Sequence, residues 1–256
     1  MAETTTHVTR RFVSTLLLIG AALLLIGNTS HPVDVDASTT SRLGLAADVT
    51  WMPIHLAIAA GVMAVVGALV VLPQAIAHPR GAAYARLAAA AAVVGGTALV
   101  LVFGALDGYG QAALAKLWAT SSGAEREAIE AVALALDTID SGMTAIGILA
   151  LFGAALTALG AAILASRLVG RWLGWTAVGI GLAGAVTGVL FATLGSTPLV
   201  INGLFRPVAM AATLYFVALA VALRRRPLQA STTGQDASDR AAHGRTPDDT
   251  AGARLV

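Results

Sequence analysis

The sequence predicts an all-α fold, a six-helix transmembrane bundle with a short acidic extracytoplasmic helical cap. Three observations support this prediction. Hydrophobic residues make up 57% of the 256-residue chain and charged residues only 12%, whereas soluble domains average about 25% charged residues. Six apolar segments are each long enough to cross the hydrocarbon core of a bilayer. Between the third and fourth segments, Gln111–Asp140 is amphipathic and acidic, which predicts the cap.

The six segments define three parts of the chain. Residues 1–11 are expected to form a polar cytoplasmic leader and 12–226 the membrane domain. Residues 227–256 lack apolar periodicity and are predicted to be a disordered cytoplasmic tail. The spans are expected at about 12–28, 51–73, 84–106, 141–166, 172–194 and 204–223.

The first apolar segment, Phe12–Asn28, has two interpretations. It follows Arg10 and Arg11, as both a first span and the hydrophobic region of a cleaved signal peptide would. It is long for the hydrophobic region of a signal peptide, and no small-x-small cleavage site directly follows Gly27. We therefore expect an uncleaved span, followed by a polar loop over Thr29–Thr50.

Aromatic residues and turn signals place the next elements. Trp51 opens the second span at an interfacial position, and Pro53 suits a first helical turn. The third span is expected to stop at Asp107-Gly108-Tyr109-Gly110. Gln111–Ala119 is then predicted to be a short interfacial helix anchored by Trp118.

The stretch Glu125–Ser166 organises the rest of the chain. It begins as an acidic amphipathic helix, with Ser122 as a plausible N-cap, and becomes an uncharged span after Ser141 without a break signal. The fifth span contains Gly184-x-x-x-Gly188, a spacing that lets a neighbouring backbone approach closely. Such small-residue faces favour packing inside the bundle, or a homo-oligomer. The lipid bilayer is an expected partner, and a protein partner is the alternative to the homo-oligomer.

Charge distribution predicts the orientation. With both termini cytoplasmic, nine arginines lie near the inner surface, and only Arg42, Lys116, Arg126 and Arg206 lie on the outer side. A bacterial cytoplasmic (inner) membrane location is expected. The net charge of +2 indicates no nucleic-acid partner. The nine inner residues are Arg10, Arg11, Arg80, Arg86, Arg167, Arg171, Arg224, Arg225 and Arg226.

Five ionisable residues near the predicted outer surface form a candidate polar pocket. His55 is the only histidine inside a predicted span, and ionisable groups at membrane depth are expensive unless they have a function or a partner. Carboxylates with a histidine suit a divalent cation, whereas carboxylates with an arginine suit a gate or a polar substrate. The simpler alternative is a solvated acidic rim and a histidine bonded to a carbonyl or to Asp48. The pocket candidates are His55, Asp107, Asp137, Asp140 and Arg206.

Motifs for catalysis or cofactors are not evident. There is no cysteine, and no H-E-x-x-H or comparable ligand spacing. His31, His78 and His243 fall in two loops and the tail, which argues against a haem held between two helices. We expect no cofactor, leave a metal open, and consider an enzyme the weakest class.

Three short motifs together resemble a loose group of six-span bacterial membrane proteins of unknown function. They are Trp51-x-x-x-His55-Leu56, Ala105-Leu106-Asp107-Gly108 and Arg171-Trp172-Leu173-Gly174-Trp175. The resemblance implies the six-helix architecture and no activity. The leading functional hypothesis is a non-catalytic sensor, scaffold or binding protein with an acidic outer surface. The alternative is a small transporter or channel gated by the five pocket candidates.

Overall fold

The computed structural model describes residues 2–32 and 38–225, and every regular element in these ranges is helical. Six helices are long and apolar enough to cross a membrane, so by helix length and hydropathy the chain is a multi-pass membrane protein. The tail predicted over 227–256 lies outside the described residues. The six candidate spans are His7–Ser30, Trp51–Ala75, Pro79–Thr120, Gly123–Ser166, Arg171–Leu194 and Leu199–Arg225.

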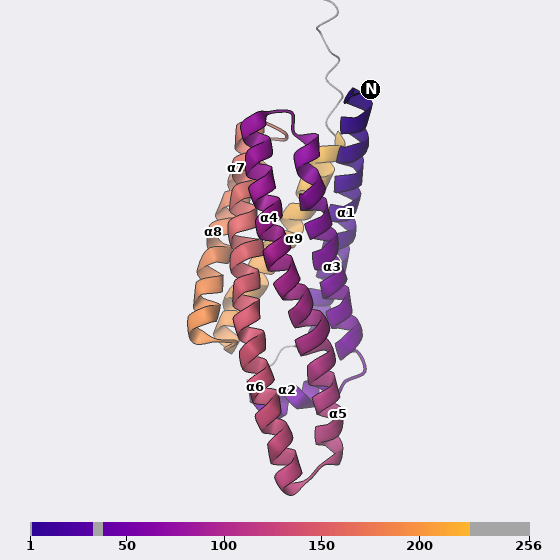
Figure 1. Cartoon of the computed structure of the whole chain (residues 1–256), viewed down its shortest axis with the longest axis vertical. Coiled ribbons are helices and arrows are strands. Elements are labelled where there is room, and N and C mark those ends of the chain that lie inside the picture. Colours follow the sequence, from indigo (N-terminus) through magenta and orange to yellow (C-terminus); the bar gives the residue numbers. More distant parts are fainter. Residues whose placement is uncertain (1, 33–37, 226–256) are drawn as a thin grey trace, which may run out of the picture. The chain divides into compact units, whose positions relative to one another are not determined.

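Several spans are composite, because short 3₁₀- or π-helical segments continue the α-helices. The long helix that includes α6 and α7 can be followed in Figure 1. The labels η1 to η4 mark these segments: η1 is a 3₁₀ turn, and η2, η3 and η4 are π-helical. The elements are α1 (Ala2–Ser30), α2 (Thr39–Ala46), α3 (Trp51–Val71), η1 (Leu72–Ala75), α4 (Pro79–Leu101), η2 (Val102–Gln111), α5 (Ala112–Thr120), α6 (Gly123–Gly147), η3 (Ile148–Ala155), α7 (Leu156–Ser166), α8 (Arg171–Leu194), η4 (Leu199–Phe205) and α9 (Arg206–Arg225).

Small residues allow the spans to pack closely. Helix α1 packs against α3 and α9, while α8 packs against α7 and η3. A Cβ on Gly20 would lie 2.9 Å from the carbonyl oxygen of Gly61, and one on Gly184 would lie 2.7 Å from that of Phe152. Neither approach leaves room for a larger side chain, which confirms the packing role of glycine in the fifth span. Large apolar side chains such as Leu182 face outward, as lipid contact requires.

The expected helix stop at Asp107–Gly110 is wrong. The helix that begins at Pro79 continues through η2 and α5 to Thr120, so α5 is not a separate helix. The glycines serve close approach instead. A Cβ on Gly108 would lie 2.2 Å from the carbonyl oxygen of Phe103 and 3.0 Å from Cβ of His55. Gly108 therefore lets η2 adopt its π-helical turn and pack against α3.

The helix predicted to run unbroken from the acidic stretch into the fourth span is confirmed, because α6, η3 and α7 form one helix over Gly123–Ser166. Ser122 precedes it as the N-cap residue, but its side chain makes no capping hydrogen bond. The segment expected to be a loop over Thr29–Thr50 is partly helical, since it contains the short helix α2. Ser38 caps this helix by accepting a hydrogen bond from the Ser41 amide. Helix α2 packs against α5, α6 and η2.

Candidate functional site

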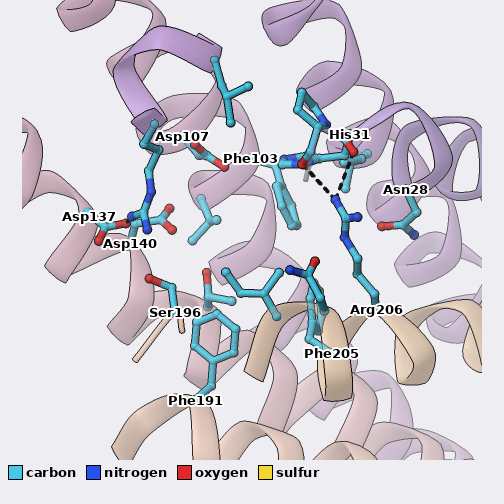
Figure 2. A pocket seen from close by; sticks show the side chains of 18 of the residues that line it. Asn28, His31, Phe103, Asp107, Asp137, Asp140, Phe191, Ser196, Phe205 and Arg206 are labelled. Atoms are coloured by element: carbon cyan, nitrogen blue, oxygen red, sulfur yellow. Dashed lines mark hydrogen bonds and ion pairs between the residues drawn. The ribbon is translucent and has the colours of Figure 1, made fainter. Parts of the chain in front are cut away.

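A cavity of about 120 Å³ lies at the end of the bundle where α1 and α8 end and α3 and α9 begin. In Figure 2, Asp137 and Asp140 lie on one side of it and His31 and Arg206 on the other. Its walls combine apolar and polar side chains. The lining residues are Asn28, His31, Pro32, Arg42, Leu45, Trp51, Ile58, Val102, Phe103, Asp107, Asp137, Asp140, Thr144, Phe191, Ser196, Pro198, Ile201, Asn202, Phe205 and Arg206.

The structure brings the five pocket candidates together. Asp107, Asp137, Asp140 and Arg206 line the cavity directly. His55 is fully buried behind the wall, and its Nε2 lies 2.9 Å from Oδ2 of Asp107. Four different stretches of the chain, in α3, η2, α6 and α9, therefore contribute to one site.

His31 completes a cluster that the sequence analysis missed. It directly follows α1, and its amide donates to the Gly27 carbonyl, which extends the helical hydrogen-bonding pattern by one residue. Its Nε2 lies 3.1 Å from Nε2 of His55. One ligand-type atom from each of His31, His55 and Asp107 lies within 4.8 Å of the other two. The sequence signal for His31 was the His31-Pro32 pair shortly after the first apolar segment, in the part of the chain predicted to be a loop.

Trp51 fixes the orientation of this cluster. Its carbonyl oxygen lies 2.7 Å from Nδ1 of His55, which is one helical turn further along α3. Its indole Nε1 donates to the Asp107 carbonyl at 2.8 Å, which ties α3 to η2. The Trp51 ring also packs against the rings of His31 and His55, with centroids 5.4 Å and 4.5 Å away. His55 is thus hydrogen-bonded to a carbonyl oxygen, as the simpler alternative in the sequence analysis expected, and it also contacts the Asp107 carboxylate.

Arg206 holds the end of α1 in place. Its Nη2 donates to the carbonyl oxygens of His31 and Pro32, both at 3.0 Å (Figure 2). Nδ1 of His31 lies 2.9 Å from the Pro32 oxygen and 3.4 Å from Nη2 of Arg206. The pKa of His31 lies below its usual 6.5, mainly because of burial and secondly because of the neighbouring His55. A neutral imidazole is the form that binds metals.

Arg42, which entered the sequence analysis only as an outer charge, forms an ion pair with Asp137 across the cavity wall. The pair joins α2 to α6. Nearby, Oδ1 of Asp140 and Oδ1 of Asn202 are buried and accept no hydrogen bond from any residue in the described ranges. Both residues line the cavity. Its wall therefore contains two acceptor oxygens that no described protein group satisfies.

Two π-helical segments meet at this cavity. Val102, Phe103 and Asp107 come from η2, while Ile201, Asn202 and Phe205 come from η4. π-Helical turns within α-helices are rare and occur frequently at functional sites. Here they bring Asp107 and Asn202 into the same cavity.

Comparison with known protein families, curated proteins and solved structures finds no significant match. The fold and the site together define a class: a multi-pass, all-α membrane protein with a polar cavity at one end of its helical bundle. No family is assigned, and the resemblance to six-span bacterial membrane proteins stays a prediction.

Proposed function

We propose that the protein is a non-catalytic binding protein or sensor of the membrane, and that its cavity holds a small cationic or hydrogen-bond-donating solute. The observation that carries the proposal is the pair of unpartnered oxygens on Asp140 and Asn202. A buried acceptor without a donor costs about 1–3 kcal/mol. A solute bearing N–H groups or a positive charge removes that cost at both oxygens.

Charge balance favours a cation. Three carboxylates line the cavity, from Asp107, Asp137 and Asp140, against two arginines. Arg42 pairs with Asp137, whereas Arg206 donates to the carbonyl oxygens of His31 and Pro32 rather than to a carboxylate of the described residues. Carboxyl groups therefore outnumber guanidinium groups in the cavity wall. Its volume of about 120 Å³ exceeds the roughly 10–15 Å³ that one water molecule needs, so the cavity has room for a small ion or amine.

We place the cavity on the extracytoplasmic side. The arginine distribution supports this orientation, as does the acidic composition of Gln111–Asp140, which we propose to be the outer cap and acidic outer surface. Trp118 braces this part of the chain: its Nε1 donates to Glu130 at 2.8 Å, and the Arg126 guanidinium lies over its ring. The α5–α6 hairpin extends beyond the neighbouring spans at the end of the bundle away from the N-terminus (Figure 1).

Because the chain has no cysteine, single-cysteine labelling tests this orientation cleanly. Ser121→Cys should react with a membrane-impermeant thiol reagent added to intact cells. His78→Cys, at the turn before α4, should react only after permeabilisation. The reversed pattern would refute the orientation.

Thermal melting of the detergent-purified protein tests the binding function. In the presence of a chelator, ammonium, methylammonium and ethanolamine are titrated at constant ionic strength. A solute at 100 times its dissociation constant adds about 2.7 kcal/mol to the stability of the folded state. The rise in melting temperature should disappear in Asp140→Asn and persist in Glu127→Gln, an exposed neutralisation on the same helix. An equal rise in melting temperature in both variants would refute binding of the solute in the cavity.

The π-helical segments η2 and η4 favour a second candidate, a small transporter or channel with the five pocket candidates as its outward-facing gate. Irregular helical turns at a binding site are places where a span can rearrange. Uptake of a labelled cavity solute into vesicles, abolished by Asp140→Asn, would support this function. Binding of the solute without uptake would support the binding or sensor function instead.

A further inference from the structure

The hydrogen-bond partners of the two histidines determine which ring nitrogens carry hydrogen. Nδ1 of His55 lies 2.7 Å from the Trp51 carbonyl oxygen, and Nδ1 of His31 lies 2.9 Å from the Pro32 oxygen. A carbonyl oxygen can only accept, so each Nδ1 is the donor. The contact of His31 Nδ1 with Arg206 is longer, at 3.4 Å, and does not reverse this assignment. In the neutral rings, both Nε2 atoms consequently carry a lone pair.

Three lone-pair-bearing atoms therefore converge at the cavity wall. Nε2 of His55 lies 3.1 Å from Nε2 of His31 and 2.9 Å from the Asp107 carboxylate oxygen. Acceptors at these separations repel one another unless a positive charge lies among them. A single hydrogen on His55 Nε2 points toward either His31 or Asp107, and it leaves the other contact without a hydrogen between its two atoms. One metal ion satisfies all three atoms.

We propose that His31, His55 and Asp107 bind one divalent transition-metal ion of the zinc type, through the two Nε2 atoms and a carboxylate oxygen. The inference rests on the proposed function, because it takes the cavity to be open to small cations. Two imidazoles and one carboxylate are a donor set that suits zinc and its neighbours rather than Mg²⁺ or Ca²⁺. With ligands at about 2.0–2.1 Å, tetrahedral geometry separates two ligand atoms by about 3.3 Å, close to the 3.1 Å and 2.9 Å that separate His55 Nε2 from the ligand atoms of His31 and Asp107.

The surroundings match those of a metal site. Metal-binding histidines commonly donate their second ring nitrogen to a carbonyl oxygen, as His55 does to Trp51 and His31 does to Pro32. Arg206 holds both carbonyl groups of the His31–Pro32 pair. Since His31 and Asp107 also line the cavity, the fourth coordination position faces it and is open to water or to a solute.

The test is metal binding by the full chain, purified in detergent through a tag without histidine and then stripped with a chelator. Co²⁺ and Zn²⁺ are titrated by calorimetry, and bound ions are counted by elemental analysis. The wild type should bind one ion per chain, and Co²⁺ should give the intense visible absorption of a tetrahedral site. His31→Gln and Asp107→Asn should each lower the affinity by more than about tenfold. His78→Gln, which changes a histidine in the turn before α4, should not.

Absence of a stoichiometric ion in the wild type, or equal affinity in the wild type and both cluster variants, would overturn the metal site and indicate a cluster that shares only a proton. Melting curves recorded on the same samples show that each variant is folded, and Asp107→Asn carries the test if His31→Gln does not fold. If no metal binds while ammonium or methylammonium still stabilises the chelator-treated protein, the metal site fails and the proposed function stands.

Discussion

The Nε2 atoms of His31 and His55 lie 3.1 Å apart, across the connection that joins α1 to α3. The two rings meet nearly edge to face, with centroids 4.8 Å apart, and Trp51 packs against both. Elsewhere the α1–α3 contact consists of small and apolar residues, such as Gly20 against Gly61 and Val65. One end of an otherwise apolar helix pair is therefore held by polar groups beside the cavity.

Replacing His55 should destabilise the protein substantially. The ring is fully buried and bonded to Trp51 and Asp107. His55→Ala leaves a cavity and removes the partner of a largely buried carboxylate, which together cost about 2–3 kcal/mol. Denaturant unfolding in detergent, followed by tryptophan fluorescence, measures the loss. His78→Ala is the comparison variant: it removes only the contact of the His78 ring with the Gly81 amide at 3.4 Å, which caps α4, and should cost about 1 kcal/mol. A similar loss in both variants would contradict the role of His55.

Two glycines of η2 provide a matched pair. Gly108→Ala should destabilise by about 2 kcal/mol or more, because the added methyl group would overlap the Phe103 carbonyl and press on His55. Gly104→Ala places its methyl group in open space and should be neutral or stabilising by up to about 1 kcal/mol. Melting temperatures of the two variants decide the question. Equal tolerance at both positions would argue against the close approach of η2 to α3.

The ion pair between Arg42 and Asp137 should contribute measurably to stability, because both side chains are mostly shielded, with 16% and 24% of their surfaces exposed. A double-mutant cycle with Arg42→Gln and Asp137→Asn should give a coupling free energy of about 1 kcal/mol. The comparison pair, Arg126 and Glu130, is more exposed and lies at 3.8 Å. The coupling free energy of this second pair should stay below about 0.5 kcal/mol. A larger coupling free energy for it than for Arg42 and Asp137 would contradict the prediction.

Asp48, just before α3, provides a pH-dependent prediction. The amide and hydroxyl of Thr50 both donate to its carboxylate at 2.7 Å and lower its pKa below 3.8. The folded state therefore binds this proton less readily than the unfolded state. The resulting stabilisation is present above pH 3.8 and is lost as the pH falls through the folded-state pKa. Thr50→Val removes one donor and should raise the pKa toward 3.8, as an NMR titration of the Asp48 carboxyl would show; an unchanged pKa would mean that the hydroxyl contributes nothing.

The fold was largely predictable because segment length and hydropathy are local properties of a membrane span. The helix running from Glu125 into the fourth span could be predicted, since no residue in it ends a helix. The error at Asp107–Gly110 arose because glycine both ends helices and permits close packing. Only the neighbouring chain, here Phe103 and His55, decides between these roles.

The site was predictable in part. Asp107, Asp137 and Asp140 were recognised because carboxylates near span ends are conspicuous in an apolar chain. His31 and Arg42 were not, because their positions depend on long-range contacts. Arg206 donates to the His31 carbonyl from 175 residues away in sequence, and Arg42 pairs with Asp137 of α6. Residue type and spacing carry no record of such contacts.

The π-helical turn of η2 also bears on the evolution of the chain. Such a turn accommodates one more residue than an α-helical turn, so losing a single residue from Val102–Gln111 restores a regular α-helix. The helix on either side of the turn would keep its phase, because the deletion removes only the residue that the wider turn absorbs. The side chains within the turn, Asp107 among them, would change direction while the span kept its hydropathy. A one-residue gap at this point in an alignment would therefore mark descendants that kept the membrane architecture and lost the site.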